Sequence, residues 1–222
     1  MLVGEGCHHD AQLIKGAVVT DPREEFGWLS GDGPLGDIYC VSFIRDLSPA
    51  EVLTRLGAEP DSIEKVTFDE LDERVMANIQ ETDGLEAGHV GVTSFDGWTL
   101  LVEPWGGWGA LREVLTELSR GTEMVSVCRN DYASHMFGYA IDGDVITNFM
   151  LERLKDREGS DPSRLTASMR AVGLDPDHAL EDDRVDDPIA CAFALATRIT
   201  GIAFADWDPH ETDFLGAEIV PD

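Results

Sequence analysis

Two Asp-Gly pairs, each lying between two runs of strand-forming residues, constrain the fold of this chain more than any other feature. They are Asp96-Gly97 and Asp142-Gly143. A type I′ turn needs positive φ at both of its central residues, and Asp-Gly meets that need at low cost. The sequence therefore predicts two antiparallel hairpins, with strands at residues 89–95 and 98–102 and at residues 135–141 and 145–149.

Hydrophobic periodicity and capping residues predict the remaining elements. Ser48 with Glu51, and Thr67 with Glu70, have the spacing of capping boxes and indicate the starts of two helices. Further helices are expected over 111–121, 161–173 and 189–200. Further strands are expected over 38–44 and 124–128, with a possible last short strand at 217–220.

The order of these elements is β-α-α-β-β-α-β-β-β followed by helices, which indicates an α+β fold. Its first part resembles a split βαββαβ unit extended by a second hairpin. We expect a mainly antiparallel sheet of five to six strands, with helices on one face and a helical C-terminal part. Residues 1–36 are interpreted as an irregular N-terminal arm. Residues 37–222 are interpreted as a single domain with a helical extension from about residue 151.

The charge of the chain limits the kinds of molecule that it is expected to bind. It has 44 acidic and 16 basic side chains, a formal net charge of −28. Nucleic acids and anionic membranes are bound by basic surfaces, so neither is expected as a direct partner. An acidic surface instead speeds the capture of a basic protein. The competing explanation for the charge is that all proteins of the source organism are acidic. The even spread of acidic residues along the chain fits this explanation. The oligomeric state stays open.

Several sequence signals suggest a cytoplasmic protein without metal or cofactor. No apolar stretch approaches the roughly 20 residues that span a bilayer, and the first ten residues lack the basic and apolar regions of a secretory signal. The four cysteines, Cys7, Cys40, Cys128 and Cys191, form no C-x-x-C pair. We therefore expect reduced, buried thiols, no disulfide, no essential metal and no cofactor.

Two stretches of sequence resemble a known family pattern. The first is Phe43-x-Arg45-x-Leu47-x-Pro49, and the second is Gly97-Trp98-Thr99-Leu100-Leu101-Val102-Glu103-Pro104. Together they resemble a family of uncharacterised actinobacterial proteins, a domain of unknown function, over roughly residues 37–200. The resemblance implies the order of elements and the cellular setting but no activity. In that pattern Asn-Gly follows Glu-Pro, whereas this chain has Trp105-Gly106.

The densest unusual cluster of side chains contains Glu103, Trp105 and Trp108, together with Trp98. Glycines at 106, 107 and 109 give the backbone freedom between a strand and a helix. The spacing matches neither a P-loop nor a dinucleotide-binding pattern. One interpretation is ordinary packing, with Trp98 in the core and a flexible turn beyond it. The functional interpretation is a tryptophan hot spot for a protein partner.

A polar cluster at the end of another strand offers a different site. Arg129-Asn130-Asp131-Tyr132 and His135, with Glu103, could make an acid–base site. No nucleophile signature accompanies them, so a polar loop tip is the competing interpretation. We assign no catalytic residue and keep Arg129 as a candidate binding residue.

Three further segments carry acidic or metal-ligating side chains. The run 181–187 includes Asp182 and Asp183, which we take as candidate binding residues on an acidic surface, against a plain solvated run. Cys7-His8-His9-Asp10 has metal-ligand chemistry, but adjacent strand residues point in opposite directions and cannot all face one ion. Residues 206–213 are rich in oxygen ligands yet lack the order of an EF-hand loop. We interpret the first of these two as a flexible terminus and the second as an acidic solvated loop.

These observations leave three functional hypotheses. The first is a non-enzymatic interaction domain of the immunity, antitoxin or defence-accessory kind that binds a basic protein. The second is an enzyme or small-ligand-binding protein with a pocket near Glu103, Trp105 and Arg129. The third is an acidic accessory subunit of a larger assembly. A deep pocket would favour the second, and a flat aromatic or acidic surface would favour the first or the third.

Overall fold

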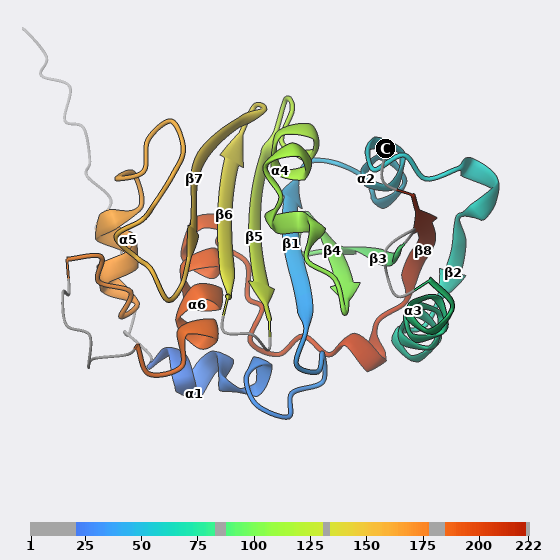
Figure 1. Cartoon of the computed structure of the whole chain (residues 1–222), viewed down its shortest axis with the longest axis horizontal. Helices are drawn as coiled ribbons and strands as arrows, with labels where there is room; N and C mark the ends of the chain where they lie inside the picture. Colours follow the sequence, from blue (N-terminus) through green and yellow to red (C-terminus); the bar gives the residue numbers. More distant parts are fainter. Residues whose placement is uncertain (1–20, 83–87, 131–133, 178–184, 221–222) are drawn as a thin grey trace, which may run out of the picture.

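An eight-stranded antiparallel sheet forms the centre of the computed structural model (Figure 1). The structure describes residues 21–82, 88–130, 134–177 and 185–220. Within them the sheet order is β2-β8-β3-β4-β1-β5-β6-β7. The strands are β1 (Tyr39–Arg45), β2 (Glu64–Val66), β3 (Gly88–Phe95), β4 (Trp98–Pro104), β5 (Glu123–Arg129), β6 (Met136–Ile141), β7 (Asp144–Met150) and β8 (Phe214–Ile219).

Both predicted hairpins are confirmed. Phe95 is paired with Trp98, and Ile141 is paired with Asp144. All four turn residues have positive φ: 48° and 81° in the first Asp-Gly pair, and 51° and 79° in the second. The order β3-β4-β1-β5, with every neighbouring pair antiparallel, is the one that a split βαββαβ unit produces.

Six α-helices accompany the sheet in the described residues. They are α1 (Pro22–Phe26), α2 (Pro49–Arg55), α3 (Phe68–Thr82), α4 (Arg112–Leu118), α5 (Thr166–Ala171) and α6 (Pro188–Thr200). The capping boxes predicted from Ser48 and Thr67 are both present, because each side chain accepts the backbone N–H three residues later and the glutamate accepts in return. None of these helices is long and apolar enough to span a membrane.

The helices cover both faces of the sheet, which corrects the expectation of one covered face. On one face, α6 packs in a large core that also contains Tyr39 and Phe43 of β1. On the other face, α2 and α4 pack around Ile44 of the same strand. Six consecutive residues of β1 are buried, and a strand buried on both sides needs a layer on each side. Figure 1 shows α4 in front of the sheet and α6 behind it.

The sheet has eight strands rather than the expected five to six, and the chain after residue 150 is not simply helical. Helix α5 has six residues, and after α6 the chain returns to the sheet as β8. Strand β2 was not predicted, because its three residues are too few for a periodic signal. Strand β8 lies between β2 and β3 and pairs with both of them, so the end of the described chain packs beside strands from its first half.

Part of the segment expected to be an irregular arm packs on the main core. Helix α1 and the short 3₁₀ helix η1 (Gly27–Leu29) place Phe26 and Leu29 in the same hydrophobic core as α6. The hydroxyl of Tyr39 donates to the carbonyl of Leu29 at 2.7 Å. These contacts attach residues 21–29 to the strand at the centre of the sheet.

Candidate functional site

The turn that follows β4 carries two of the tryptophans singled out in the sequence. Trp105 has φ of 55°, in the left-handed region that bulky residues rarely adopt. The residue is 44% exposed, and its indole N–H donates to Asp72 Oδ1 of α3 at 3.1 Å. Its backbone N–H donates to the carbonyl of Ile38 at 2.9 Å. The turn therefore presents an aromatic side chain at the surface and fixes its direction.

The side chain of Glu103 binds the part of the turn that contains Trp108 and Gly109. This side chain is almost fully buried, and its two oxygens accept the backbone N–H groups of Trp108 at 2.7 Å and Gly109 at 2.8 Å. Burial raises the pKa of this carboxyl to about 7, although the two N–H groups act in the opposite direction. Both oxygens are thus used to hold the 3₁₀ turn η3 (Trp108–Ala110).

A disulfide lies beside this carboxylate and corrects the expectation of free thiols. Cys40 and Cys128 face each other across β1 and β5, and their sulfurs are bonded. Cys40 is also the register partner of Glu103 on β4. The pairing could not be recognised from a sequence separation of 88 residues, because it depends on which strands are neighbours. Cys191 is a buried free thiol, as predicted, and Cys7 lies outside the described residues.

A small hollow opens between this turn and α3, with a volume of about 80 Å³. Trp108 closes one side of it, where its ring lies so close to Gly88 that a Cβ there would be 2.6 Å away. Apolar side chains and the two tryptophans dominate the lining. The lining residues are Val75, Asn78, Ile79, Gly88, His89, Val90, Glu103, Pro104, Trp105, Gly106 and Trp108.

A second hollow of about 280 Å³ adjoins the first and shares His89 with it. Its lining is acidic and consists of Asp61, Ser62, Glu64, Arg74, His89 and Glu218. Arg74 is paired with Glu64 at 2.6 Å. Burial lowers the pKa of His89, while Glu218 acts in the opposite direction. His89 and Asp72 could not be recognised from the sequence, because nothing in their local pattern shows that β3 and α3 meet the tryptophan turn.

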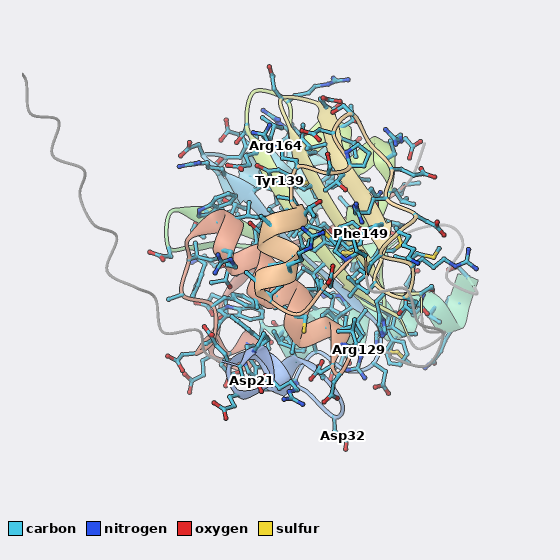
Figure 2. The ribbon with its side chains drawn as sticks, turned by 90° about the vertical axis from the view of Figure 1, so that its left-hand side faces the viewer. Asp21, Asp32, Arg129, Tyr139, Phe149 and Arg164 are labelled. Atoms are coloured by element: carbon cyan, nitrogen blue, oxygen red, sulfur yellow. A yellow bond between two sulfur atoms is a disulfide. The ribbon has the colours of Figure 1, made fainter. Side chains whose placement is uncertain are left out.

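Arg129 does not belong to this site. It is the register partner of Tyr39, whose side chain lies in the core of α6, so Arg129 faces away from Glu103. Its guanidinium donates to the carbonyls of Gly31 and Gly36 and pairs with Asp37, each at 2.8 Å. Figure 2 shows Arg129 at the same end of the molecule as Asp32. The proposed acid–base cluster is therefore divided between the two faces.

The other sequence-predicted groups are placed only in part. Asp182, Asp183, Asp131, Tyr132 and the segment Cys7-His8-His9-Asp10 lie outside the described residues. His135 accepts the backbone N–H of Asn130 through Nδ1 at 3.1 Å. In the acidic 206–213 segment, His210 binds Asp69 of α3 at 2.9 Å. No group of three or more metal-ligating side chains occurs in the part of the chain that the structure describes.

A comparison with known families supplies one match. The model of a family of unknown function, DUF6461, matches residues 20–220. No curated protein and no solved structure matches the chain. The match agrees with the expectation of a family without assigned activity. The actinobacterial setting and the Gly-Trp-Thr-Leu-x-Val-Glu-Pro pattern stay predictions.

Proposed function

The chain belongs to DUF6461, a family of unknown function, and from its own surface we propose that it is a non-enzymatic interaction domain that binds a basic protein. The contact surface in this proposal, the Trp105 surface, consists of Trp105, the hollow beside it and the acidic side chains of α3. A cytoplasmic role of the immunity, antitoxin or defence-accessory kind is part of the same proposal.

The observation that carries this proposal is the combination of strain and exposure at Trp105. A left-handed conformation costs a non-glycine residue about 1 kcal/mol or more. Trp105 adopts it and is nevertheless 44% exposed. Such strain persists where the surrounding structure imposes it and is often found at functional sites. Tryptophan is one of the residues most enriched at the hot spots of protein interfaces.

The charge around Trp105 supports a basic partner. Helix α3 has five acidic residues and one basic residue, Arg74, which is already paired with Glu64. Asp72 binds the indole of Trp105, and the neighbouring hollow is lined by further carboxylates. An arginine or lysine of a partner can therefore stack on an aromatic ring while its charge is compensated.

The geometry gives less support to an enzyme or a small-ligand site. Ligand pockets commonly enclose about 300–1,000 Å³, whereas the hollow beside Glu103 measures about 80 Å³ and the acidic hollow next to it about 280 Å³. Both oxygens of Glu103 are bound to backbone N–H groups. Arg129, the third residue of that hypothesis, lies on the opposite face of the sheet. The acidic accessory-subunit hypothesis would use the same surface as the leading proposal.

The test compares Trp105→Asn with Met150→Asn in partner binding. Asparagine tolerates positive φ, so Trp105→Asn should keep the turn while removing the aromatic surface. Met150 is similarly exposed, at 41%, but lies on β7, at the opposite edge of the sheet from β2. Proteins that the wild type retains from native lysate are identified and purified. Their association and dissociation rates with the wild type and with each variant are then measured by surface plasmon resonance.

We expect Trp105→Asn to weaken binding of such a protein by about 2 kcal/mol, mainly through faster dissociation, and Met150→Asn to leave it unchanged. Association should slow as NaCl rises from about 0.05 to 0.5 M, because salt screens electrostatic steering. A partner that is not basic, or that binds both variants and the wild type equally at all salt concentrations, would contradict the proposal.

A further inference from the structure

The Cys40–Cys128 disulfide lies where it is not needed to align its strands. Strands β1 and β5 pair continuously from Tyr39 opposite Arg129 to Ile44 opposite Met124, so backbone hydrogen bonds already define the register. The disulfide lies under η3, where Ala110 packs against both cysteines. Disulfides that do form in the cytoplasm are mostly catalytic or redox-sensing, and the chemistry around these sulfurs suits such a role.

Three polar groups surround the two sulfurs. The hydroxyl of Ser126 lies within hydrogen-bond distance of both, at 3.2 Å from Cys40 Sγ and 3.5 Å from Cys128 Sγ. A donor at this position stabilises whichever thiolate forms when the bond is cleaved. The hydroxyl of Ser42 is fully buried and has no hydrogen-bond partner among the described residues. A plain structural disulfide needs neither hydroxyl.

Glu103 is the third group and can supply a proton. A Cβ built on Gly109 would lie 2.9 Å from Glu103 Oε1 and 3.1 Å from Cys40 Sγ, so the carboxyl and the sulfur approach the same point. Burial raises the pKa of Glu103 to about 7, so a large fraction of this carboxyl carries a proton at neutral pH. We take this carboxyl as the proton source for a thiolate formed at Cys40.

We propose that Cys40 and Cys128 form a reversible thiol–disulfide switch that a dithiol reduces and that changes the packing of the turn at Trp108 and Gly109. One thiolate of the dithiol attacks Sγ of Cys128, because this residue is 5% exposed whereas Cys40 is fully buried. The S–S bond breaks, and Cys40 leaves as a thiolate that takes a proton. The second thiol of the reductant then displaces Cys128. Two electrons and two protons move, which leaves two cysteine thiols and one oxidised dithiol.

The turn responds because it lies directly on the sulfurs. Two thiol sulfurs in contact lie further apart than two bonded sulfurs. Because Gly109 has no side chain that could change its rotamer, its backbone has to move when the sulfurs separate. This movement of the backbone changes the hydrogen bonds from the N–H groups of Trp108 and Gly109 to Glu103. Any effect on partner binding rests on the proposed function above, whereas movement of the turn does not.

The first experiment equilibrates the folded protein with dithiothreitol at graded ratios of its reduced and oxidised forms. Free thiols are trapped and counted after denaturation. We expect a reversible transition in which the reduced protein has two more free thiols than the oxidised protein. A bond that stays intact in the folded protein at every ratio, and that is reduced only after denaturant is added, would overturn the proposal.

The second experiment measures amide hydrogen exchange of residues 105–112 in both redox states. Reduction should speed exchange there several-fold in the wild type and in Cys191→Ser, which keeps the disulfide. It should have no effect in the double variant Cys40→Ala/Cys128→Ala, which should exchange rapidly in either buffer. Equal exchange in the two redox states of the wild type would overturn the switch, whatever the result of the partner-binding experiment.

Discussion

At the scale of single residues, Glu103 has the most unusual environment among the described carboxyl groups. Its neighbours on β1 and β5 are sulfurs and hydroxyls rather than bases, and no described basic side chain pairs with it. Only the N–H groups of Trp108 and Gly109 compensate its charge. Because burial is the larger effect, the pKa lies above the ordinary value of 4.5, at about 7.

This shift predicts how stability depends on pH. Between about pH 4.5 and 7 the folded state retains the Glu103 proton and the unfolded state does not. The unfolded state therefore binds fewer protons, and the free energy of unfolding falls as pH rises, by at most roughly 3 kcal/mol. The loss is complete above about pH 7. Glu103→Gln cannot ionise, so its stability should fall less over this window.

Urea unfolding at several pH values measures the effect. Repulsion among the many carboxylates also lowers stability as pH rises, so the difference between wild type and variant isolates Glu103. Glu113→Gln, which removes an exposed glutamate of α4, is the matched control and should keep the wild-type slope. A Glu103→Gln variant with the same slope as the wild type would show that the carboxyl is ionised throughout.

At the scale of elements, the start of α6 connects the last helix to the N-terminal segment. Asp187 is its N-cap: the carboxylate accepts the backbone N–H of Ala190 at 3.0 Å and the hydroxyl of Ser30 at 2.5 Å. Asp187 also has a φ of 55°. One side chain thus satisfies the helix end and holds residues near α1 against it.

We predict that Asp187→Ala lowers the free energy of unfolding by about 2 kcal/mol, because it removes the cap and places alanine in a left-handed conformation. Asparagine caps helices as well as aspartate and tolerates positive φ. Asp187→Asn should therefore lose much less stability. Urea unfolding of the two variants provides the comparison, and equal losses would show that the negative charge, rather than the cap geometry, stabilises this junction.

At the scale of the whole molecule, charge is the dominant property. A net charge of −28 on 222 residues opposes compaction. Most of the described basic side chains are on the surface. Several are already paired, such as Arg45 with Glu123 and Arg120 with Glu117. Much of the remaining negative charge is therefore uncompensated.

Salt should accordingly stabilise the fold. We predict that the free energy of unfolding rises as NaCl increases from about 0.01 to 0.5 M, because the Debye length falls from roughly 30 Å to a few Å. Urea unfolding at constant pH measures it, and the melting temperature should rise in parallel. A stability that is constant or falls with salt would mean that favourable pairs outweigh repulsion.

The features that depend on neighbouring residues could be predicted from the amino-acid sequence. The Asp-Gly turns, the capping boxes at Ser48 and Thr67 and the buried helix α6 all follow from local backbone preference and periodicity, and the structure has each of them. Trp105 and Glu103 could also be selected as candidate site residues, because an aromatic, glycine-rich turn after a strand is a local pattern. The acidic character of the surface depends only on composition.

The contacts between segments far apart in the sequence could not be predicted and are known from the folded chain. The position of β8 between β2 and β3, the second covered face of the sheet and the Cys40–Cys128 bond each depend on register between strands far apart in the sequence. The same holds for the separation of Arg129 from Glu103, because a residue's face is set by its pairing partners. Local preference carries no information about these pairings, which are selected by burial of both faces of the central strands.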